Sequence, residues 1–487
     1  MILQDIFRDV PLKAQSGDFN CEVRALHYRS SEVRPGDLFF AWQGEKADGH
    51  SYIEDALNRG AVALLTEKMT SVPSGIAWAM AESGRRTLAL ASANFFGLPA
   101  QTLQMVGITG TNGKTSTATL VHYLLERAGI VAGLLGTIEY RIGSERVEAS
   151  RTTPESHELQ KMLAGMLDHG CRAAVMEVSS HALVLNRVAG IPFRVAIFTN
   201  LTQDHLDFHK DMESYFRAKE MLFTGLSAGA TAVVNIDDPY GRRLVGSLPK
   251  GVELKTYSLR GPADYEARDL VCTDKGVSFS CHMNGEVIPV NVPWMGEFNA
   301  ANVLAVIAAV RALGVTGSQL RDWLPEAPFV PGRMERIPGS GEFQVLVDYA
   351  HTDDAVRNLL QSLRPLARGR LRILIGCGGD RDSTKRPLMA RVACELADDV
   401  FFTSDNPRSE DPDVILRQMS AGVPDFKNVH VIKDREKAIQ SMIESALSGD
   451  ILVLAGKGHE NTQEIAGVKL PFSDLEVASR WLRGSQS

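Results

Sequence analysis

The segment Gly107-Ile108-Thr109-Gly110-Thr111-Asn112-Gly113-Lys114-Thr115 decides the fold that we expect for this chain. Residues 104–108 have the apolar character of a short buried strand, and residues 114–127 have the pattern of a helix. A glycine-rich turn between a strand and a helix lets backbone N–H groups surround a phosphate, and the helix N-terminus adds partial positive charge. The segment therefore predicts a nucleotide-binding loop.

Two side chains of this loop suit phosphate chemistry. Lys114 can reach the β- and γ-phosphates of a nucleotide, and the Thr115 hydroxyl can bind Mg²⁺. The generic pattern GxxxxGK[ST] would put a glycine at position 108, where this chain has Ile108. A turn that only joins the strand to the helix is the alternative, and the loop alone does not separate a kinase, a switch GTPase and a ligase. The residues expected to contact the nucleotide here are Gly110, Thr111, Asn112, Gly113, Lys114, Thr115 and Ser116.

The pattern of strands and helices continues on the C-terminal side of the loop. An alternation of buried strands and helices predicts an α/β fold with a parallel sheet and helices on both faces. Strands are expected at 173–178, 195–199, 232–235, 345–348, 373–376, 400–403 and 451–454, and helices at 156–167 and 212–223. Residues 270–292 alternate apolar and polar side chains, which favours half-exposed antiparallel strands. We expect three domains, at residues 1–97, 98–330 and 331–487.

Composition limits the classes of partner. The chain has 487 residues, 44% of them hydrophobic, and a formal net charge of −7, which does not indicate general affinity for nucleic acid or anionic membranes. The six cysteines are scattered without a CxxC pair, so neither a zinc site nor a disulfide framework is indicated. The first residues are too polar for a signal peptide, and no apolar run is long enough to span a bilayer. We therefore expect a cytoplasmic protein.

The variant Gly110–Ser116 resembles the phosphate loop of the Mur ligases and of their folylpolyglutamate synthase relatives. Further motifs of that family follow in order at 152–155, 176–181, 199–207, 218–219, 296–302, 331–333, 348–352, 378–381, 405–408 and 456–460. The resemblance covers nearly the whole chain. It implies a uridine-nucleotide-binding N-terminal domain, a central P-loop-type ATPase domain and a Rossmann-like C-terminal domain that binds an amino acid.

The resemblance also implies an ATP-dependent ligase that forms an amide bond through an acyl phosphate, with two Mg²⁺ ions. Glu177 lies at the end of a predicted strand, where open α/β sheets place ligand-facing residues, and with Thr115 it is a candidate for the first Mg²⁺. His205 and a carbamate on Lys219 are implied as ligands of the second. The alternatives are a structural histidine and an exposed helix lysine. Lys114, Lys219 and His205 are the implied catalytic residues.

Further contacts follow from the resemblance alone. The implied adenine and ribose contacts are Asn299, Asn302, Arg333, Asp348 and His351. The implied contacts to the UDP-linked acceptor are Ser30, Thr152, Thr153, Ser179, Leu185 and Arg187. Leu185 stands where some relatives have a polar residue, and the residues around Ser30 also depart from the family pattern.

Residues Asp405-Asn406-Pro407-Arg408 resemble the motif of the members that add diaminopimelate. Arg408 can hold the distal carboxylate of meso-diaminopimelate in a bidentate pair, Asn406 can add a hydrogen bond, and lysine would leave that arginine unpaired. Further expected contacts are Arg381, Gly456 and Glu460. The alternative structural role of the motif is a turn.

The expected reaction joins meso-diaminopimelate to UDP-N-acetylmuramoyl-L-alanyl-D-glutamate in peptidoglycan biosynthesis, catalysed by a monomer without nucleic-acid or membrane partners. Three alternatives stay open. The same ligase reaction could use L-lysine, a folylpolyglutamate synthase-like ligase could act on a folate, or a nucleotide-binding regulatory protein could share the scaffold.

Overall fold

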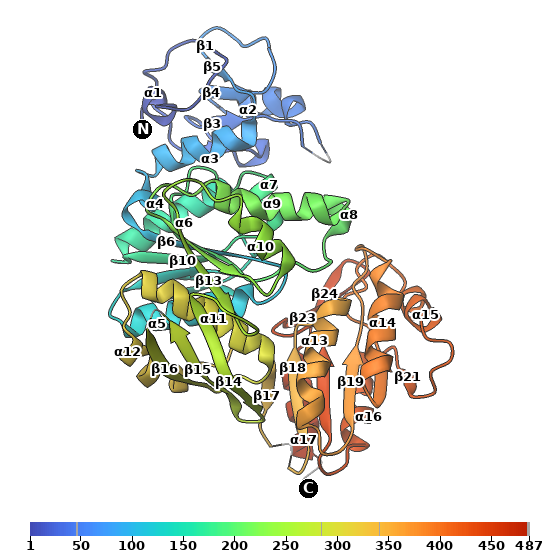
Figure 1. Ribbon diagram of the computed structural model, residues 1–487. Helices are drawn as coiled ribbons and strands as arrows, with labels where there is room; N and C mark the ends of the chain where they lie inside the picture. Colours follow the sequence, from blue (N-terminus) through green and yellow to red (C-terminus); the bar gives the residue numbers. More distant parts are fainter. Residues whose placement is uncertain (45–46, 284, 340, 485–487) are drawn as a thin grey trace.

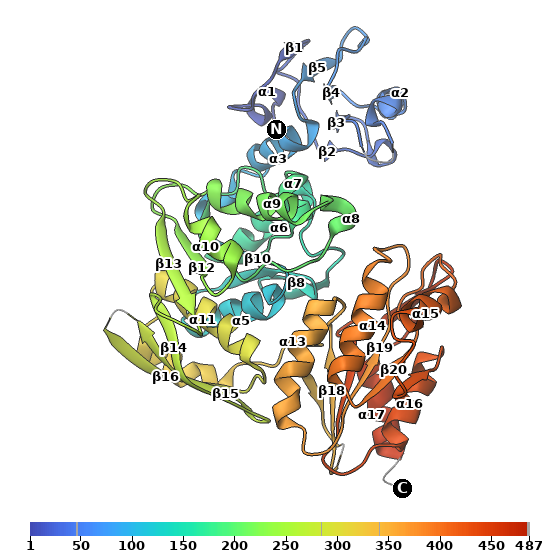
Figure 2. The ribbon, with the colours of Figure 1, turned by 45° about the vertical axis from the view of Figure 1, so that its right-hand side comes forward.

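The computed structural model describes residues 1–44, 47–283, 285–339 and 341–484. It contains three bodies that follow one another along the chain, each with its own main sheet (Figures 1 and 2). The N-terminal body (blue in Figure 1) lies at one end, and the C-terminal body (orange to red) lies beside the central one. The boundaries predicted from the sequence, 97/98 and 330/331, lie in the stretches between the sheets.

The N-terminal domain has a five-stranded sheet in the order β1-β5-β4-β3-β2, in which β1 pairs antiparallel and the other pairs are parallel. Its strands contain two to four residues, too few for a clear sequence pattern, and none of them was predicted. The elements are β1 Ala14–Ser16, β2 Leu26–His27, β3 Leu38–Phe40, β4 Ala63–Thr66, β5 Ala77–Met80, α1 Leu3–Ile6, α2 Ile53–Asn58 and α3 Gly84–Phe95.

The central domain contains an eleven-stranded sheet in the order β16-β15-β14-β13-β12-β11-β6-β10-β7-β8-β9. Its middle is parallel, as predicted, and the predicted strand and helix next to the phosphate loop are confirmed as β6 and α5. The parallel strands are β6 Gln104–Thr109, β7 Ala132–Leu135, β10 Ala173–Glu177, β11 Phe193–Phe198, β12 Thr231–Asn235 and β13 Glu253–Ser258.

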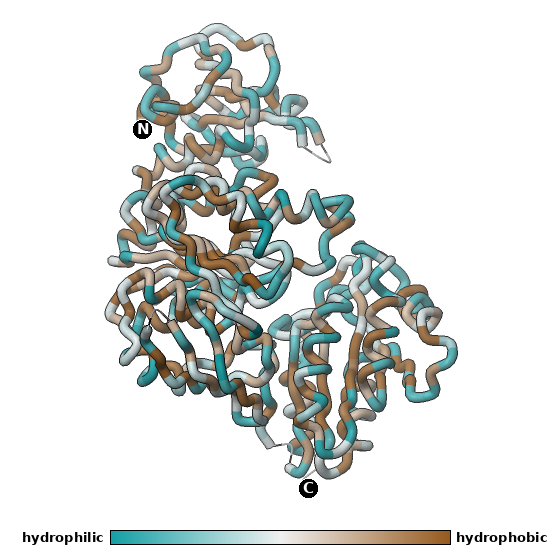
Figure 3. Tube along the Cα trace, viewed as in Figure 1, coloured by the Kyte–Doolittle hydropathy of each residue, from teal (hydrophilic) through white to brown (hydrophobic). Residues whose placement is uncertain are grey.

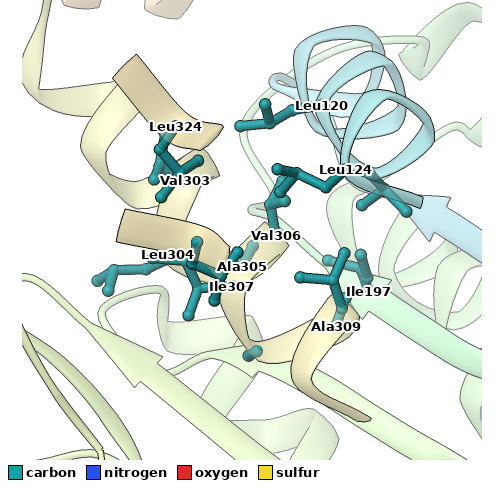
Figure 4. Close-up of a cluster of buried hydrophobic side chains, with 14 of the residues drawn as sticks. Leu120, Leu124, Ile197, Val303, Leu304, Ala305, Val306, Ile307, Ala309 and Leu324 are labelled. Atoms are coloured by element: carbon teal, nitrogen blue, oxygen red, sulfur yellow. The ribbon is translucent and has the colours of Figure 1, made fainter. Parts of the chain in front are cut away.

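Helices cover both faces of this parallel region, because alternate residues of each strand enter different cores. Val106 and Ile108 of β6 belong to the core below α5 (Lys114–Arg127) and α11 (Glu297–Ala312). Met105 belongs to the opposite core, below α6 (Ser156–Asp168) and α9 (Met212–Thr224). Figure 4 shows Leu120 and Leu124 of α5 beside Val306 of α11, and Figure 3 shows the central strands as hydrophobic segments.

Both ends of the central sheet are antiparallel. The predicted antiparallel strands are confirmed as β14 Tyr265–Thr273, β15 Gly276–Met283 and β16 Glu286–Val292. The sequence pattern did not show that they extend the parallel sheet, which they do through the β13–β14 pairing. At the other end, β8 Glu139–Ile142 and β9 Glu145–Glu148 form a hairpin that was not predicted.

The C-terminal domain has a six-stranded sheet in the order β17-β18-β22-β19-β20-β21, parallel except for β17. All four strands predicted here are confirmed. The strands are β17 Glu335–Ile337, β18 Gln344–Asp348, β19 Leu371–Ile375, β20 Asp399–Phe402, β21 Val429–Val431 and β22 Ile451–Ala455. The helices are α13 Asp353–Leu363, α14 Lys385–Leu396, α15 Pro412–Ala421, α16 Arg435–Glu444 and α17 Asp474–Gly484. A separate hairpin, β23 Thr462–Ile465 and β24 Val468–Pro471, follows β22.

Short helices make up the rest of the regular structure in the described chain. The α-helices are α4 Pro99–Thr102, α7 Ser180–Val184, α8 Leu206–His209, α10 Pro239–Val245 and α12 Gly317–Trp323. The 3₁₀ turns are η1 Ser30–Glu32, η2 Gly49–Tyr52, η3 Leu324–Glu326 and η4 Arg364–Leu366. The C-terminal domain packs on the central domain through α13 and α11. In the described part of the chain, no helix combines the length and the apolar character needed to cross a bilayer.

Candidate functional site

The phosphate loop lies between β6 and α5, at the carboxyl edge of the parallel strands. Open α/β sheets bind ligands at this edge. The loop is held by the neighbouring strand end: Asn112 N donates to Asn200 Oδ1 at 2.9 Å, and Thr199 Oγ1 donates to Asn112 O at 2.7 Å. Sequence analysis gave Thr199 and Asn200 no role, although both belong to a family motif. They fix the shape of the loop from the adjacent strand.

Two glycines of the loop have no room for a side chain. Gly110 has a φ of +151°, and a Cβ there would lie 1.8 Å from Thr199 Oγ1. Gly113 has a φ of +85°, and a Cβ there would lie 2.3 Å from Asn302 Oδ1. The close approach places Asn302 directly against the loop, as expected for a nucleotide contact. Asn302 Nδ2 in turn donates to Asn299 Oδ1 at 3.1 Å, so the two asparagines of α11 act as one unit.

We expect Gly113→Ala to weaken nucleotide binding at least about tenfold and to destabilise the protein by roughly 1–3 kcal/mol, because the new methyl group meets Asn302 and the backbone is already left-handed. Gly129→Ala is the matched control at the other end of α5, with a φ of +73° and nothing within 4 Å of its Cβ. Nucleotide titration and thermal unfolding measure both effects. Equal nucleotide affinities of the two variants would contradict the role assigned to the Gly113–Asn302 contact.

Lys114 begins α5 and folds back over the loop. Its Nζ donates to Gly110 O at 2.9 Å and to Thr111 O at 2.8 Å. Desolvation lowers the pKa of Lys114, and the Glu177 carboxylate opposes that effect. The ammonium is thus held within the loop that would surround the phosphates.

Thr115 and Glu177 face each other across the loop. Thr115 Oγ1 donates to Glu177 Oε2 at 3.1 Å, and Glu177 is 1% exposed. Thr137 holds the carboxylate, with its N–H donating to Oε1 at 2.8 Å and its hydroxyl to Oε2 at 3.1 Å. A hydroxyl beside a fixed carboxylate is an oxygen pair that suits Mg²⁺, which keeps waters and phosphate oxygens as its other ligands. Sequence analysis paired these two residues and missed Thr137.

Lys219 lies on the buried face of α9, under the loop, and is 2% exposed. Its Nζ donates to Gly110 O at 2.8 Å and lies 4.6 Å from the ring centre of Tyr215. Desolvation lowers the pKa of Lys219 well below its ordinary value, and the nearby Lys114 adds to the shift. The exposed-lysine alternative is therefore wrong, and burial favours the neutral amine that carbamate formation needs.

His205 is the N-cap residue of α8 and has a left-handed φ of +54°. Its ring lies 4.9 Å from that of His181 and 6.2 Å from that of Tyr215, which also contacts Lys219. Asp204 Oδ2 is 3.4 Å from its Nε2. Within the described residues, no group of three or more His, Cys, Asp or Glu side chains could hold a metal ion.

The linker between the central and C-terminal domains carries Arg333. Its Nη2 donates to Thr115 Oγ1 at 3.2 Å, and its guanidinium lies 4.6 Å from the ring centre of Tyr349. Asp348 accepts from Met334 N at 2.7 Å and from Ala350 N at 2.8 Å, which fixes the linker against the end of β18. Arg333 therefore lies at the phosphate end of the nucleotide site. Asp348 organises the chain beside it.

A cleft of about 360 Å³ separates the central and C-terminal domains. From the central domain it is lined by Thr152, His181, Gln203, Asp204, His205 and Asp207. The C-terminal side includes residues assigned from sequence, namely His351, Arg381, Asp405, Asn406, Arg408, Gly456 and Glu460, and two that were missed, Cys377 and Lys385. The cleft thus joins the candidate second metal site to the predicted amino-acid site.

The loop Asp405–Arg408 follows β20, at the carboxyl edge of the C-terminal sheet. Arg408 has a φ of +53°, and its N–H donates to Glu464 O of the β23–β24 hairpin at 3.0 Å. Its Nη1 donates to Gly379 O at 2.7 Å, and 27% of its side chain is exposed. Asn406 Nδ2 donates to Glu460 Oε2 at 2.8 Å. The turn alternative and the binding alternative are compatible, because the turn presents these side chains to the cleft.

Arg386 is a buried residue that sequence analysis missed. It is 1% exposed, and its Nη1 and Nη2 each donate to Glu410 at 2.9 Å. Its Nη2 also donates to Gly378 O at 3.1 Å. Gly378 precedes Arg381, and Glu410 follows Arg408, so Arg386 ties together the two loops that carry the cleft arginines.

Arg386→Met is expected to lower the free energy of unfolding by about 2 kcal/mol or more, because it leaves Glu410 and the Gly378 carbonyl without their buried partner. It should also raise the KM for the amino acid that enters the cleft. Arg364→Met is the control in the same domain. It removes an ion pair with Asp398 whose partners are both 42% exposed, and should cost less than about 1 kcal/mol. Chemical denaturation measures the free energy of unfolding of both variants. Similar losses would contradict the role of Arg386 in joining the two loops.

The predicted acceptor contacts gather at the ends of β10 and α7. Thr153 Oγ1 donates to Glu177 O at 2.8 Å, Ser179 N donates to Thr153 Oγ1 at 3.1 Å, and Thr137 Oγ1 lies 3.1 Å from Thr152 Oγ1. Arg187 Nη2 lies 2.8 Å from Glu155 Oε1, a partner that sequence analysis did not assign. Leu185 is the C-cap of α7. Thr153 therefore contacts Glu177 directly, and Thr152 and Ser179 are linked to it through Thr137 and Thr153.

Ser30 belongs to the N-terminal domain and begins a 3₁₀ turn, where it is buried. Its hydroxyl bonds the Asp55 carboxylate, and this bond contributes most to lowering the pKa of Asp55. Nearby, the ring of Tyr28 lies 5.2 Å from that of His157 in α6. The N-terminal domain thus contacts the central domain near the acceptor residues.

Comparisons with known proteins agree with this arrangement. Three sequence profiles match the chain: the Mur ligase family catalytic domain at residues 22–100, the Mur ligase middle domain at 108–310, and the Mur ligase glutamate ligase domain at 332–458. The UDP-N-acetylmuramoyl-L-alanyl-D-glutamate–2,6-diaminopimelate ligase of Solibacter usitatus is 45% identical over 466 residues, covering 95% of this chain and 94% of its own. The protein of the same name from Synechococcus elongatus is 43% identical over 497 residues, with 100% of both chains covered.

Solved structures give the same result. A structure of a UDP-N-acetylmuramoyl-L-alanyl-D-glutamate–2,6-diaminopimelate ligase matches with a TM-score of 0.72 and 32% identity, covering 100% of this chain and 99% of that one. The MurF ligase of Thermotoga maritima, solved with ADP, shares the fold with a TM-score of 0.63 and 20% identity, covering 95% of this chain and 99% of that one. With matches at this identity along its full length, the chain belongs to the Mur ligase family of amide-bond-forming ligases.

Proposed function

We propose that this protein uses ATP to join meso-diaminopimelate to UDP-N-acetylmuramoyl-L-alanyl-D-glutamate, giving the UDP-linked tripeptide, ADP and phosphate. One observation carries the proposal. A single cleft holds His205 and Asp204 on its central-domain side and Arg381, Asn406, Arg408 and Glu460 on its C-terminal side. An amino acid held by its distal end among the C-terminal residues would have its other end near the phosphate loop. The names of the full-length relatives agree with this substrate.

The proposed chemistry has two steps. The γ-phosphoryl group of ATP moves to the terminal carboxylate of the acceptor, so that a bond to ADP breaks and an acyl phosphate forms. The amine of diaminopimelate then attacks the acyl carbon, loses a proton, and phosphate leaves. Phosphoryl transfer needs positioning and charge neutralisation more than nucleophilic side chains. Lys114 inside the loop and Arg333 on Thr115 supply positive charge at the phosphates.

The residues present fit a Mg²⁺ ion at Thr115 and Glu177, since a hydroxyl and a carboxylate oxygen lie 3.1 Å apart and Thr137 fixes the carboxylate. A bound Mg²⁺ would neutralise charge on the phosphate oxygens. A second ion would be held by His205 and by a carbamate that forms when the neutral amine of Lys219 adds carbon dioxide and loses a proton. Burial of Lys219 and its lowered pKa support that modification. Asn299, Asn302, Asp348 and His351 remain the proposed adenosine contacts, whereas the bond from Arg333 to Thr115 favours a contact at the phosphate end of ATP.

Recognition of diaminopimelate depends on charge at its distal end. Its far carboxylate would pair with Arg408, with Arg381 beside it, and its far ammonium with Glu460 and the Gly456 carbonyl. Lysine lacks the carboxylate and would leave Arg408 with only the partly exposed Glu464 carboxylate, 4.0 Å from its Nε, as an anionic partner. We place the acceptor at Thr152, Thr153, Ser179, Leu185 and Arg187, with its uridine at Ser30. We also propose that the enzyme is a cytoplasmic monomer without nucleic-acid or membrane partners.

Phosphate release with ATP, Mg²⁺ and the UDP-linked dipeptide tests the proposal. Diaminopimelate should support release far better than lysine, and mass spectrometry should show the tripeptide product. If lysine were the better substrate, the specificity would be wrong. If no amino acid supported release, a nucleotide-binding regulatory role on the same scaffold would replace the ligase. Removal of Mg²⁺ with a chelator should stop the reaction.

A further inference from the structure

Lys457 is a buried cation behind the amino-acid end of the cleft. It lies in the loop that follows β22, and its side chain is 0% exposed. Its Nζ donates to Asn406 Oδ1 at 3.1 Å and to Glu460 Oε2 at 3.1 Å, and it lies 3.7 Å from Asp405 Oδ1. All three of these partners line the cleft. Lys457 is therefore separated from a ligand in the cleft by a single layer of side chains, those of Asp405, Asn406 and Glu460.

The contacts of Asn406 fix the direction of its amide. Its Oδ1 accepts from Lys457 Nζ at 3.1 Å and from Glu464 N at 3.0 Å. A side-chain amide has one carbonyl oxygen that accepts and an NH₂ group that only donates. A reversed amide would point N–H groups at an ammonium and at a backbone N–H. The NH₂ group is therefore held away from Lys457, with one hydrogen on Glu460 Oε2 at 2.8 Å and the other available to the cleft.

Lys457 also offsets negative charge that would oppose an anionic ligand. Asp405 and Glu460 bring two carboxylates to this end of the cleft, and the ammonium lies between them. Both bonds to Glu460 described here, from Lys457 and from Asn406, go to Oε2, which leaves Oε1 to meet a ligand ammonium. The Asn406 N–H and the Arg408 guanidinium can then receive the carboxylate of a ligand. Beside them, Glu460 Oε1 can receive its ammonium.

We propose that Lys457 is the positioning residue that makes this site select an amino acid whose far end carries a carboxylate next to an ammonium. It acts through Asn406 and Glu460: it holds the amide with its N–H toward the ligand carboxylate, and it cancels charge that would repel that carboxylate. This inference rests on the proposed function and adds a selectivity residue that the sequence motif 405–408 does not contain.

Lys457→Met keeps most of the length of the side chain and removes its charge. We expect the KM for diaminopimelate to rise about tenfold or more, because the Asn406 amide is released and the cleft gains net negative charge. The KM for ATP should stay within about twofold. Lysine has no far carboxylate, so the ratio of kcat/KM for diaminopimelate to kcat/KM for lysine should fall by about tenfold or more.

Arg372→Met is the matched control. Arg372 is a buried cation of the same domain, 3% exposed, that pairs with Asp399 at 3.3 Å. It lies at the start of β19, at the opposite edge of the sheet from the cleft. Its loss should lower stability without changing the preference for diaminopimelate over lysine. If Lys457→Met acted only by loosening the packing of the domain, both variants would keep the preference of the parent protein for diaminopimelate over lysine.

Asn406→Asp provides an independent test that does not create an unpaired buried cation. If Lys457 and Glu464 hold the side-chain oxygen inward, the second oxygen of the introduced carboxylate replaces the NH₂ group and faces both Glu460 and the ligand carboxylate. The preference for diaminopimelate should then fall at least about tenfold. An unchanged preference would show that residue 406 does not face the ligand carboxylate, and would contradict the orienting role.

The outcomes separate the inference from the function on which it rests. A parent enzyme that does not prefer diaminopimelate would refute the proposed function, and the inference with it. A parent enzyme with that preference, together with a Lys457→Met variant that retains the full ratio, would overturn the inference alone. If Lys457→Met does not fold, the Asn406→Asp ratio decides: a fall supports the orienting role, and an unchanged ratio overturns it.

Discussion

Lys219→Ala is expected to reduce the rate of phosphate release by about 10²–10³-fold, because it removes an anionic group proposed to hold a metal beside the phosphates. Lys219 is 2% exposed, contacts Gly110 O and Tyr215, and has a pKa well below its ordinary value. A short carboxylic acid supplied in solution should restore part of the activity, since it can occupy the space of the missing carbamate. Initial rates with and without the acid measure both effects.

Two further variants make this result specific. Lys219→Arg keeps a positive charge but cannot form the carbamate, so it should also be inactive. Lys161→Ala, an exposed lysine of α6 in the same domain, should keep full activity. Full activity of Lys219→Ala without the added acid would remove Lys219 from the metal site. An active Lys219→Arg would show that charge alone is needed and would exclude the carbamate.

Arg408→Ala is expected to raise the KM for diaminopimelate about 30-fold or more while the KM for ATP changes less than about twofold. The far carboxylate would lose a charge-assisted partner, at a cost on the order of 2–5 kcal/mol. Alanine leaves the backbone strain unchanged, because residue 408 has a φ of +53° in either case. Steady-state kinetics with each substrate varied in turn separate the two constants.

The control for this variant is Arg417→Ala, which removes an exposed arginine of α15 in the same domain. It should leave both Michaelis constants unchanged. Arg408→Lys should recover only part of the affinity, because an ammonium cannot form the bidentate pair. Equal rises in the KM for diaminopimelate and the KM for ATP would contradict the proposed pocket. The amino-acid substrate would then be unidentified.

Much of the fold could be predicted because its signals are local. The strand, turn and helix around the phosphate loop appear within about 24 residues, from Gln104 to Arg127, and were confirmed almost to the residue. Four strands of the C-terminal sheet, β18, β19, β20 and β22, are short apolar runs bounded by polar segments and were also confirmed, whereas the edge strands β17 and β21 were not predicted. The N-terminal sheet was missed, since strands such as Leu26–His27 are too short to show a period.

The candidate site was predicted to a smaller extent, because motif positions do not reveal contacts. The motifs named Glu177, Lys219 and Arg408, which the structure places at the loop or the cleft. They did not include Thr137 or Arg386, and the motif 456–460 gave its Lys457 no role. All three hold those residues or their neighbours through hydrogen bonds. A buried arginine or lysine has no signature in a sequence, where most such residues are exposed.

The sequence by itself determined the phosphate loop, the alternation of strands and helices, and the family, because each depends on residues close together in the chain or on motifs read in order. Only the tertiary structure decided that Lys457 lies behind Asn406 and Glu460, and that Asn302 meets Gly113. These contacts join residues 51 and 189 positions apart, from 406 to 457 and from 113 to 302. Their energies come from burial and from the direction of donors and acceptors, which are properties of the folded chain.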